Sequence, residues 1–321
     1  MRLKSLGLAL TMCGIMTAAA NAQAVSPTGG HDVVPTGKGG WNLPAAPDLP
    51  PNFVEKRGKP KPPPPPPPAN NGINYHNGPV MLGTVHMYYI WYGDWSGNSA
   101  VDILSDLAEN IGGSPWYNIN STYYSGSGRQ LKHVSNSVSF NGSTTDDYSR
   151  GKALSDDDVR DIVADAITSG RLPKDTNGVY FVLTAKDVTE LSGFCSNYCG
   201  WHTYDKINNA NIKFAFIGDP TDQCLNGCTR QRFHSPNDNL GADGMASVIA
   251  HELSEAVTDP QINAWFDKDG EENADKCAFK FGDVYTAPNG AGANVQVGSR
   301  DFLLQQNWVN AGGGYCGMSY P

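Results

Sequence analysis

The sequence is poor in positive charge. Its 321 residues include 23 lysines and arginines against 32 aspartates and glutamates, which gives a formal net charge of −9 at pH 7. Nucleic acids and anionic membrane surfaces recruit proteins through clustered basic side chains, so this deficit argues against either as the main partner. An acidic chain is instead suited to binding cations.

The sequence also has no apolar run that suits a transmembrane helix. The run at about residues 6–20 is too short to cross a bilayer comfortably, and no basic stop follows it. Arg2 and Lys4 precede it, and small residues lead up to Ala24, which is the pattern of a secretory signal peptide. We predict a signal peptide over residues 1–24 and a secreted, extracellular protein without a membrane span. Removing the two positive charges of this segment changes the formal net charge from −9 to −11.

Sustained apolar periodicity is missing from residues 25–77. They are rich in proline, glycine and asparagine and contain the uninterrupted proline run Pro62–Pro68. Such a run forms an extended polyproline helix without a packed core. We predict a disordered Pro-rich linker over residues 25–77, followed by one domain at residues 78–321 that is long enough to bury a sizeable core.

Cysteines are few, but their number is even once Cys13 leaves with the signal peptide. An even number in an exported chain indicates disulfides, and we expect all of these to be paired: Cys195, Cys199, Cys224, Cys228, Cys277 and Cys316. The most economical connectivity is local, Cys195–Cys199 and Cys224–Cys228, with Cys277–Cys316 closing the C-terminal segment. The alternative is a structural Cys/His zinc site, because His202 or His234 follows each C-x₃-C motif.

The folded part predicts strands and helices in alternation, without an internal repeat. β-branched and aromatic residues indicate core strands at residues 80–91, 179–184 and 212–217. Amphipathic helices are expected at residues 99–110 and 155–170, the second with Ser155 as its N-cap. Alternating aromatic and polar residues at 116–140 indicate further strands joined by a turn. We therefore predict an α/β or α+β domain with a mixed sheet.

A second histidine is missing from the centre of the next predicted helix. This helix ends before Pro260 and reads HELSE at residues 251–255. His251 and Glu255 are four residues apart, so they share one helix face and can hold a single metal ion. With a histidine at position 255 the motif would be the HExxH helix of a zinc peptidase. Here glutamate takes the place of the second histidine ligand.

The position of Glu252 strengthens the metal interpretation. On a helical wheel the apolar side chains form a broad arc, with His251 and Glu255 at its border and Glu252 inside it. Ser254 and Thr258 lie on the opposite side. A carboxylate on a core-facing side is costly unless a cation, water or chemistry compensates it. We interpret Glu252 as the catalytic base of a metal-dependent hydrolase; the alternative is an inert helix with a charged border.

A third metal ligand is expected from the acidic segment that follows the helix. We nominate Asp275, which lies near Cys277, with Glu272 and Asp259 as the next candidates. His202 and His234 are two further residues that can complete a site near His251. The predicted metal is zinc.

Calcium is the less favoured metal. The sequence DKDGEE at residues 267–272 resembles part of an oxygen-rich calcium loop, with Asp267 and Asp269 in alternation and Gly270 at the turn. It lacks the full EF-hand spacing, and we assign Glu271 to a solvated turn.

Several blocks of the sequence resemble a known plant family. They include GPVMLGTVHMYYIWYGDW (78–95), SPWYNINSTYY (114–124), FAFIGDPTDQCLNGC (214–228) and GADGMASVIAHELSEAVTDP (241–260). Over about residues 78–316 the chain is similar to the EXORDIUM or phosphate-induced protein 1 family. The resemblance implies a secreted protein of the cell wall or apoplast, linked to growth and nutrient signalling, with no settled biochemical activity. It does not supply the metal chemistry, which rests on the zincin-like helix alone.

Two hypotheses of different classes follow. The first is an exported zinc-dependent hydrolase, most simply a peptidase, on a disulfide-braced zincin-like domain that acts on a peptide or cell-wall substrate. The second is a non-catalytic extracellular binding or growth-signalling protein, in which some aromatic residues stack on sugars or pack in the core: Tyr88, Tyr89, Trp91, Trp95 and Trp116. A third hypothesis keeps the ion but makes it a structural calcium. The sequence does not indicate an oligomeric state.

Overall fold

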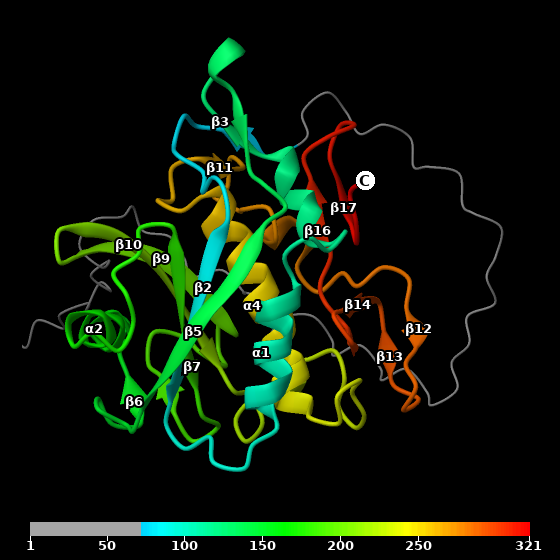
Figure 1. Ribbon diagram of the computed structural model, residues 1–321. Coiled ribbons are helices and arrows are strands. Elements are labelled where there is room, and N and C mark those ends of the chain that lie inside the picture. Colours follow the sequence, from blue (N-terminus) through cyan, green and yellow to red (C-terminus); the bar gives the residue numbers. More distant parts are fainter. Residues whose placement is uncertain (1–71) are drawn as a thin grey trace, which may run out of the picture.

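A computed structural model describes residues 72–321, which fold around a five-stranded sheet (Figure 1). The strands, in spatial order, are β5 (Val138–Asp146), β2 (Val85–Tyr92), β7 (Gly178–Thr184), β10 (Ala210–Gly218) and β9 (Gly200–Ile207). The first four run parallel, and β9 at the edge runs antiparallel to β10. This confirms the predicted mixed sheet. The predicted signal peptide and nearly all of the predicted linker lie outside the described residues.

Helices cover both faces of the sheet (Figure 1). On one face α1 (Ala100–Asn110) and α4 (Leu240–Thr258) pack against the strands and against each other, and α2 (Asp156–Thr168) packs on the other face against β7 and β10. Because both faces are covered, the central strands are apolar throughout, and every residue of β7 is buried. Within residues 72–321, no helix combines the length and the apolar character needed to cross a membrane.

The start of α2 shows how local sequence fixes a helix boundary. The Ser155 hydroxyl accepts a hydrogen bond from the backbone N of Asp158 (3.2 Å), and the Asp158 carboxylate accepts one from the backbone N of Ser155 (2.8 Å). This capping box satisfies two amide groups that the first helical turn leaves open. Gly170, at φ 75°, follows the helix where a left-handed residue is needed. The helix predicted over residues 155–170 is therefore confirmed.

The segment 116–140 differs from the prediction. Only its end enters the main sheet, as the start of β5, and its first part is the 3₁₀ helix η1 (Tyr117–Thr122). A short ribbon of β3 (Tyr124–Ser125) and β4 (Lys132–His133), with η2 (Gly128–Gln130) between them, replaces the longer predicted strands. Trp116, Tyr117 and Tyr123 are buried at the ends of the helical turn η1, so the alternation at the start of the segment does not reflect a strand.

The folded chain begins before residue 78. Strand β1 (Asn74–Tyr75) pairs with β11 (Trp265–Phe266), and the ring of Tyr75 stacks on that of Trp265 with centroids 5.2 Å apart. The last residues of the segment predicted to be a linker are thus part of the domain.

The remaining elements are short. They are β6 (Ala153–Leu154) with β8 (Thr189–Glu190), β12 (Tyr285–Thr286) with β13 (Gly292–Ala293), β14 (Val295–Val297) with β15 (Arg300–Phe302), β16 (Asn307–Val309) with β17 (Tyr315–Gly317), helix α3 (Leu225–Cys228) and the 3₁₀ helix η3 (Asp275–Cys277). The four strand pairs β6–β8, β12–β13, β14–β15 and β16–β17 are separate from the main sheet.

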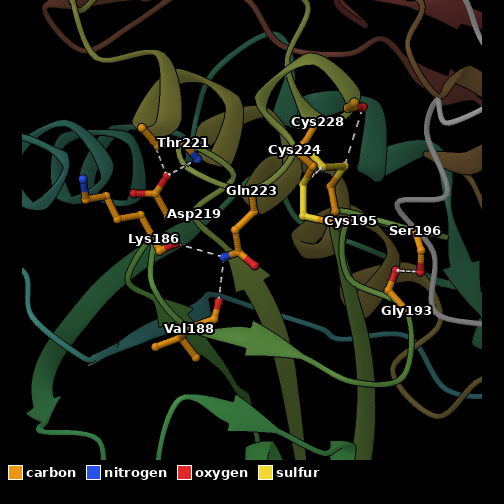
Figure 2. Close-up of a disulfide and its surroundings, with 12 residues drawn as sticks. Lys186, Val188, Gly193, Cys195, Ser196, Asp219, Thr221, Gln223, Cys224 and Cys228 are labelled. Atoms are coloured by element: carbon orange, nitrogen blue, oxygen red, sulfur yellow. Dashed lines mark hydrogen bonds between the residues drawn. A yellow bond between two sulfur atoms is a disulfide. The ribbon is translucent and has the colours of Figure 1, made fainter.

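The disulfides differ from the predicted local pairing in two cases out of three. The bridges are Cys195–Cys224, Cys199–Cys228 and Cys277–Cys316, so only the third prediction is right. The reason is the tight hairpin between β9 and β10, where Asn208 and Asn209 both have positive φ angles (48° and 61°), as a two-residue hairpin turn requires. The hairpin returns the chain alongside itself, so the two C-x₃-C motifs face each other. Figure 2 shows Cys195 of the first motif beside Cys224 and Cys228 of the second.

The aromatic residues considered for sugar stacking lie in the core. Tyr88, Tyr89, Trp91, Trp95 and Trp116 are all buried. The Trp116 indole donates a hydrogen bond to the carbonyl of Gln305 (2.9 Å), which fixes the C-terminal segment to η1. These five residues therefore build the domain and do not offer a sugar-binding surface.

Candidate metal centre

Helix α4, which carries the HELSE sequence, is buried along almost its whole length. The sheet covers one side of it, and α1, η1 and the C-terminal segment cover others. The side that the helical wheel marked as polar is also inside the protein: the hydroxyl of Ser254 donates to the Ala250 carbonyl (3.1 Å), and that of Thr258 donates to the Ser254 carbonyl (3.0 Å). The predicted one-sided amphipathic helix is thus wrong, and α4 is a central helix.

Asp259 stabilises the end of this helix. Its carboxylate accepts hydrogen bonds from the backbone N of Asn263 (2.6 Å) and of Ala264 (2.7 Å). Burial raises the pKa of Asp259 to about 6, although these amide groups act in the opposite direction. The residue that was a reserve candidate for the third ligand therefore holds the chain reversal after Pro260.

Glu255 lies between two buried histidines. Its Oε1 is 3.0 Å from Nε2 of His251, one turn earlier in α4, and its Oε2 is 3.8 Å from Nε2 of His202 in β9. The edge strand and the central helix therefore place one imidazole against each oxygen of the same carboxylate, in two groups of ligand atoms that share Glu255: His202 with Glu272, and His251 with Glu252. In a tetrahedral zinc site with bonds of about 2.0–2.1 Å, neighbouring ligand atoms are about 3.3 Å apart, which is the scale of these distances.

The acidic segment after the helix supplies two more carboxylates. Oε2 of Glu272 is 3.0 Å from Nε2 of His202, and Oδ1 of Asp275 is 3.6 Å from Nε2 of His251. The backbone N of Asp275 also donates to Oε1 of Glu255 (3.1 Å), and Oδ2 of Asp275 accepts from the backbone N of Glu272. The segment is fixed here by the Cys277–Cys316 bridge next to η3.

Several nitrogen and oxygen atoms of this cluster, each of a kind that can bind a metal ion, have no hydrogen-bond partner among the described residues. Within residues 72–321, both ring nitrogens of His251, Nδ1 of His202 and Oε1 of Glu272 are buried and lack such a partner. Nε2 of His251 is near Glu255, but the two groups lack the alignment of a hydrogen bond. Leaving buried polar atoms unsatisfied costs about 1–3 kcal/mol each. The arrangement therefore has the donors of a cation site.

Burial and the nearby carboxylates shift the pKa values of the cluster. Burial raises the pKa of Glu272 well above its ordinary value, and the neighbouring carboxylates of Glu255 and Asp259 raise it further. Burial lowers the pKa of His202 to about 4, which keeps it neutral and able to act as a ligand. Burial also works to lower the pKa of His251, but Glu255 and Asp275 outweigh it and raise that pKa well above the ordinary value.

Glu252 is adjacent to this cluster. One of its carboxylate oxygens lies within 4.8 Å of donor atoms of His251 and Glu255, and the side chain is fully buried. The helical wheel correctly placed it on a side that faces the protein.

The DKDGEE loop is held by lysines. The Asp267 carboxylate accepts from Nζ of Lys276 (2.6 Å) and from the backbone N of Asp269, and Asp269 is ion-paired with Lys268 (2.6 Å). Both alternating carboxylates of the proposed calcium loop thus have a cationic partner. Glu271 is exposed, as expected. The cluster around Glu255 is the better cation site.

The structure brings the predicted residues His251 and Glu255 together and adds His202, which the sequence did not distinguish from His234. His202 lies beside Glu255, whereas His234 lies at the surface, with Nε2 bound to the Asn289 carbonyl (2.8 Å). The missed signal was the Asn208–Asn209 turn, which makes residues 200–207 a strand next to β10. Because β10 packs on α4, an inward-facing residue of β9 reaches the helix.

The fold and the cluster together define a disulfide-braced α/β domain with a buried His/carboxylate group at its central helix.

Residues 73–301 match the sequence profile described as phosphate-induced protein 1 conserved region. The chain is 31% identical to Protein EXORDIUM-like 5 of Arabidopsis thaliana, over 83% of this chain and 85% of the relative. It is 30% identical to EXORDIUM-like 3 of the same plant (74% and 80%) and 27% identical to Protein PHOSPHATE-INDUCED 1 of Nicotiana tabacum (64% and 70%). The chain belongs to this family, as its sequence blocks indicated. No solved structure matches it.

Proposed function

We propose that this chain is a non-catalytic extracellular protein of the EXORDIUM type whose domain is locked by a buried zinc ion. His202, Glu255 and Glu272, whose ligand atoms lie within 4.8 Å of one another, would hold the ion. His251, which lies against the other oxygen of Glu255, would be the fourth ligand, and Asp275 would support Glu255 through its backbone. This differs from the set His251, Glu255 and Asp275 expected from the sequence. Two observations support an extracellular location. The chain contains three disulfides, which are typical of exported proteins. It also belongs to the phosphate-induced protein 1 family, and the resemblance to that family implies a secreted protein.

The observation that carries this proposal is that the cluster is closed. The side chains of His202, His251, Glu255 and Glu272 are at most 2% exposed, and that of Asp275 is 10% exposed. A structural zinc site uses all its positions for protein ligands, whereas a catalytic site keeps one open to solvent or substrate. Two imidazole nitrogens favour zinc over calcium, which prefers oxygen donors.

Elemental analysis of the secreted protein tests this proposal. After purification without chelators we expect about one zinc ion per chain, the content of a single four-ligand site. His251→Ala and Glu255→Ala should each lose the ion, and His234→Ala, a change at a surface histidine outside the cluster, should keep it. A parent protein free of divalent metal would overturn the zinc centre, and a stoichiometric calcium content would move the cation to oxygen ligands alone.

The HELSE helix supports a second candidate function, the zinc-dependent hydrolase. In that case Glu252 would accept the proton of a water molecule that the bound ion polarises, while the substrate would have to reach the cluster through a movement of the segment 265–277. Its support is the position of Glu252 next to His251. The burial of every neighbouring side chain favours the first candidate.

The variant Glu252→Gln separates the two candidates. It keeps the size of the side chain and removes its capacity to accept a proton. If the centre is structural, the parent and the variant should contain the same amount of zinc and should both leave a degenerate peptide library and cell-wall polymers intact. A hydrolase would instead show cleavage by the parent that falls by about 10²–10⁴ in the variant at unchanged zinc content.

A further inference from the structure

An open cavity lies at one end of the central sheet, away from the candidate metal centre. Its volume is about 570 Å³, and it is lined by Gly93, Asp94, Thr145, Asp147, Tyr148, Lys152, Lys186 and Asp187. That volume is in the range of small-molecule sites, about 300–1,000 Å³. The candidate metal cluster is on the C-terminal half of α4. This half of the helix lies near the start of β2, because the Val257 carbonyl accepts a hydrogen bond from the backbone N of Met81. The cavity is instead formed by residues just beyond β2 and β7 and around the end of β5.

The cavity lies at the point where the sheet topology forms a crevice. The chain goes from β2 to β5 on one side of it and then crosses to β7 on the other side, so the connections diverge at β2. Residues 93–94 follow β2, residues 145–148 span the end of β5, and residues 186–187 follow β7. In sheets with parallel strands, ligands bind outside the carboxyl ends of the strands at such a switch point.

An aromatic ring is held in the wall of this cavity. Tyr148 has a positive φ of 52°, and its hydroxyl donates to the Asp187 carboxylate (3.1 Å) and accepts from the backbone N of Asp94 (3.1 Å). Gly93 lets the backbone approach the ring, because a Cβ there would lie 3.1 Å from Cε1 of Tyr148 and 2.9 Å from Cβ of Ala185. The half-buried ring therefore has a fixed place in the wall.

The charges around the ring suit a neutral, hydroxyl-rich ligand. The Lys152 ammonium lies over one face of the Tyr148 ring, 4.7 Å from its centroid, and is paired with Asp187 (2.6 Å). Lys186 is paired with Asp222 (2.8 Å). Both cations are thus already neutralised, and the wall also contains Asp94 and Asp147, so an anionic ligand would meet uncompensated carboxylates. Carboxylates that accept, ammonium groups that donate and the part of the Tyr148 ring that lines the cavity together match alternating hydroxyl and C–H groups.

The loop behind the cavity is braced by the disulfide region. The Gln223 side chain donates to the carbonyls of Lys186 (3.0 Å) and Val188 (2.9 Å), and it lies one residue before Cys224 of the Cys195–Cys224 bridge (Figure 2). The Asp219 carboxylate, after β10, accepts from the backbone N of Thr221 (2.9 Å) and keeps this loop turned toward residue 186. The binding groups after β7 are therefore placed before a ligand arrives, which reduces the ordering cost of binding.

We propose that this cavity binds a neutral saccharide, with Tyr148 as its aromatic contact and Asp147, Asp187 and Lys152 as hydrogen-bonding groups. The site is independent of the metal centre, since it shares no residue with the cluster around Glu255. It gives the domain a recognition function that neither the buried aromatic residues nor the HELSE helix provides.

The test is a calorimetric titration of the full-length protein with neutral oligosaccharides: cello-, xylo- and laminari-hexaose. Oligogalacturonate and inorganic phosphate serve as anionic probes. We expect saturable one-site binding of at least one neutral hexaose. Tyr148→Asn, which removes the ring but tolerates the left-handed backbone, should weaken it by about tenfold or more. Asp147→Asn, at an exposed residue that takes part in none of the bonds holding Tyr148, should weaken it less.

Tyr285→Asn is the matched control, because Tyr285 is also partly exposed and also donates its hydroxyl to an aspartate, Asp301 (2.6 Å). This variant should bind like the parent. Thermal unfolding and zinc content, measured on all variants, identify any change caused by misfolding. The proposal is overturned if no neutral hexaose binds, if only the anionic probes bind, or if a folded Tyr148→Asn binds as tightly as the parent.

Discussion

Chelation of the proposed zinc ion should lower the thermal unfolding midpoint by about 10 °C. Without the ion, Glu255, Glu272 and Asp275 face two buried histidines with no cation to offset their charge. Breaking a buried charge pair by removing one partner costs about 3–5 kcal/mol, and 1 kcal/mol corresponds to about 2–4 °C for a domain of this size. The measurement is differential scanning calorimetry with and without EDTA, followed by restoration of the midpoint on adding zinc.

The size of this effect should depend on pH in a defined direction. Burial raises the pKa of Glu272, and the carboxylates raise that of His251. A raised folded-state pKa means that these two groups take up protons on folding, so the stability that they contribute to the metal-free protein is present at low pH and is lost as pH rises. Zinc needs deprotonated ligands and therefore binds more tightly as pH rises. The difference in midpoint between the zinc-bound and the metal-free protein should grow from pH 5 to pH 8.

The matched controls are His251→Ala and His234→Ala. The first should lower the midpoint in the absence of EDTA and should then be insensitive to it. The second changes a histidine whose side chain is 43% exposed, so it should respond to EDTA like the parent. If EDTA leaves the parent's midpoint unchanged while zinc is removed, the ion does not brace the fold.

Removing both bridges between the two C-x₃-C motifs should destabilise the protein by roughly 3–4 kcal/mol, as loop-closure entropy gives for a loop of this length. Removing either one alone should cost much less. Cys195–Cys224 and Cys199–Cys228 each span 29 residues and join the same two segments, so the remaining bridge still closes the loop. Serine pairs at each bridge, compared with the fourfold variant by urea unfolding, measure this non-additivity. Equal and additive costs would contradict it.

A non-reducing tryptic map checks the connectivity directly. Trypsin cleaves after Lys206 and Lys213, between the two motifs. With the bridges seen in the structure, the peptides that contain Cys199 and Cys228 remain linked until a reductant is added. Local pairing would release them as separate peptides in the first digest.

What the sequence could reveal depended on how local each determinant is. The Ser155–Asp158 capping box, the apolar strands β7 and β10 and the HELSE residues were all readable, because each depends on neighbours within a few residues. The two carboxylates beside His251, Glu255 and Asp275, were both expected from the sequence. The approach of His202 to Glu255 was not readable, because it requires that β9 turns back along β10. The cysteine pairing depended on the same hairpin.

The C-terminal segment determines when the central helix can be sealed. Gln305 receives the indole of Trp116, the Trp308 carbonyl receives the hydroxyl of Tyr123, and Cys316 closes the bridge to Cys277. The ligands Glu255 and Glu272 are translated well before these residues. The carboxylates of α4 and η3 are therefore enclosed only after residues 305–316 have docked. We expect a chain cut before residue 300 to leave α4 open to water and to be unable to retain the proposed zinc ion.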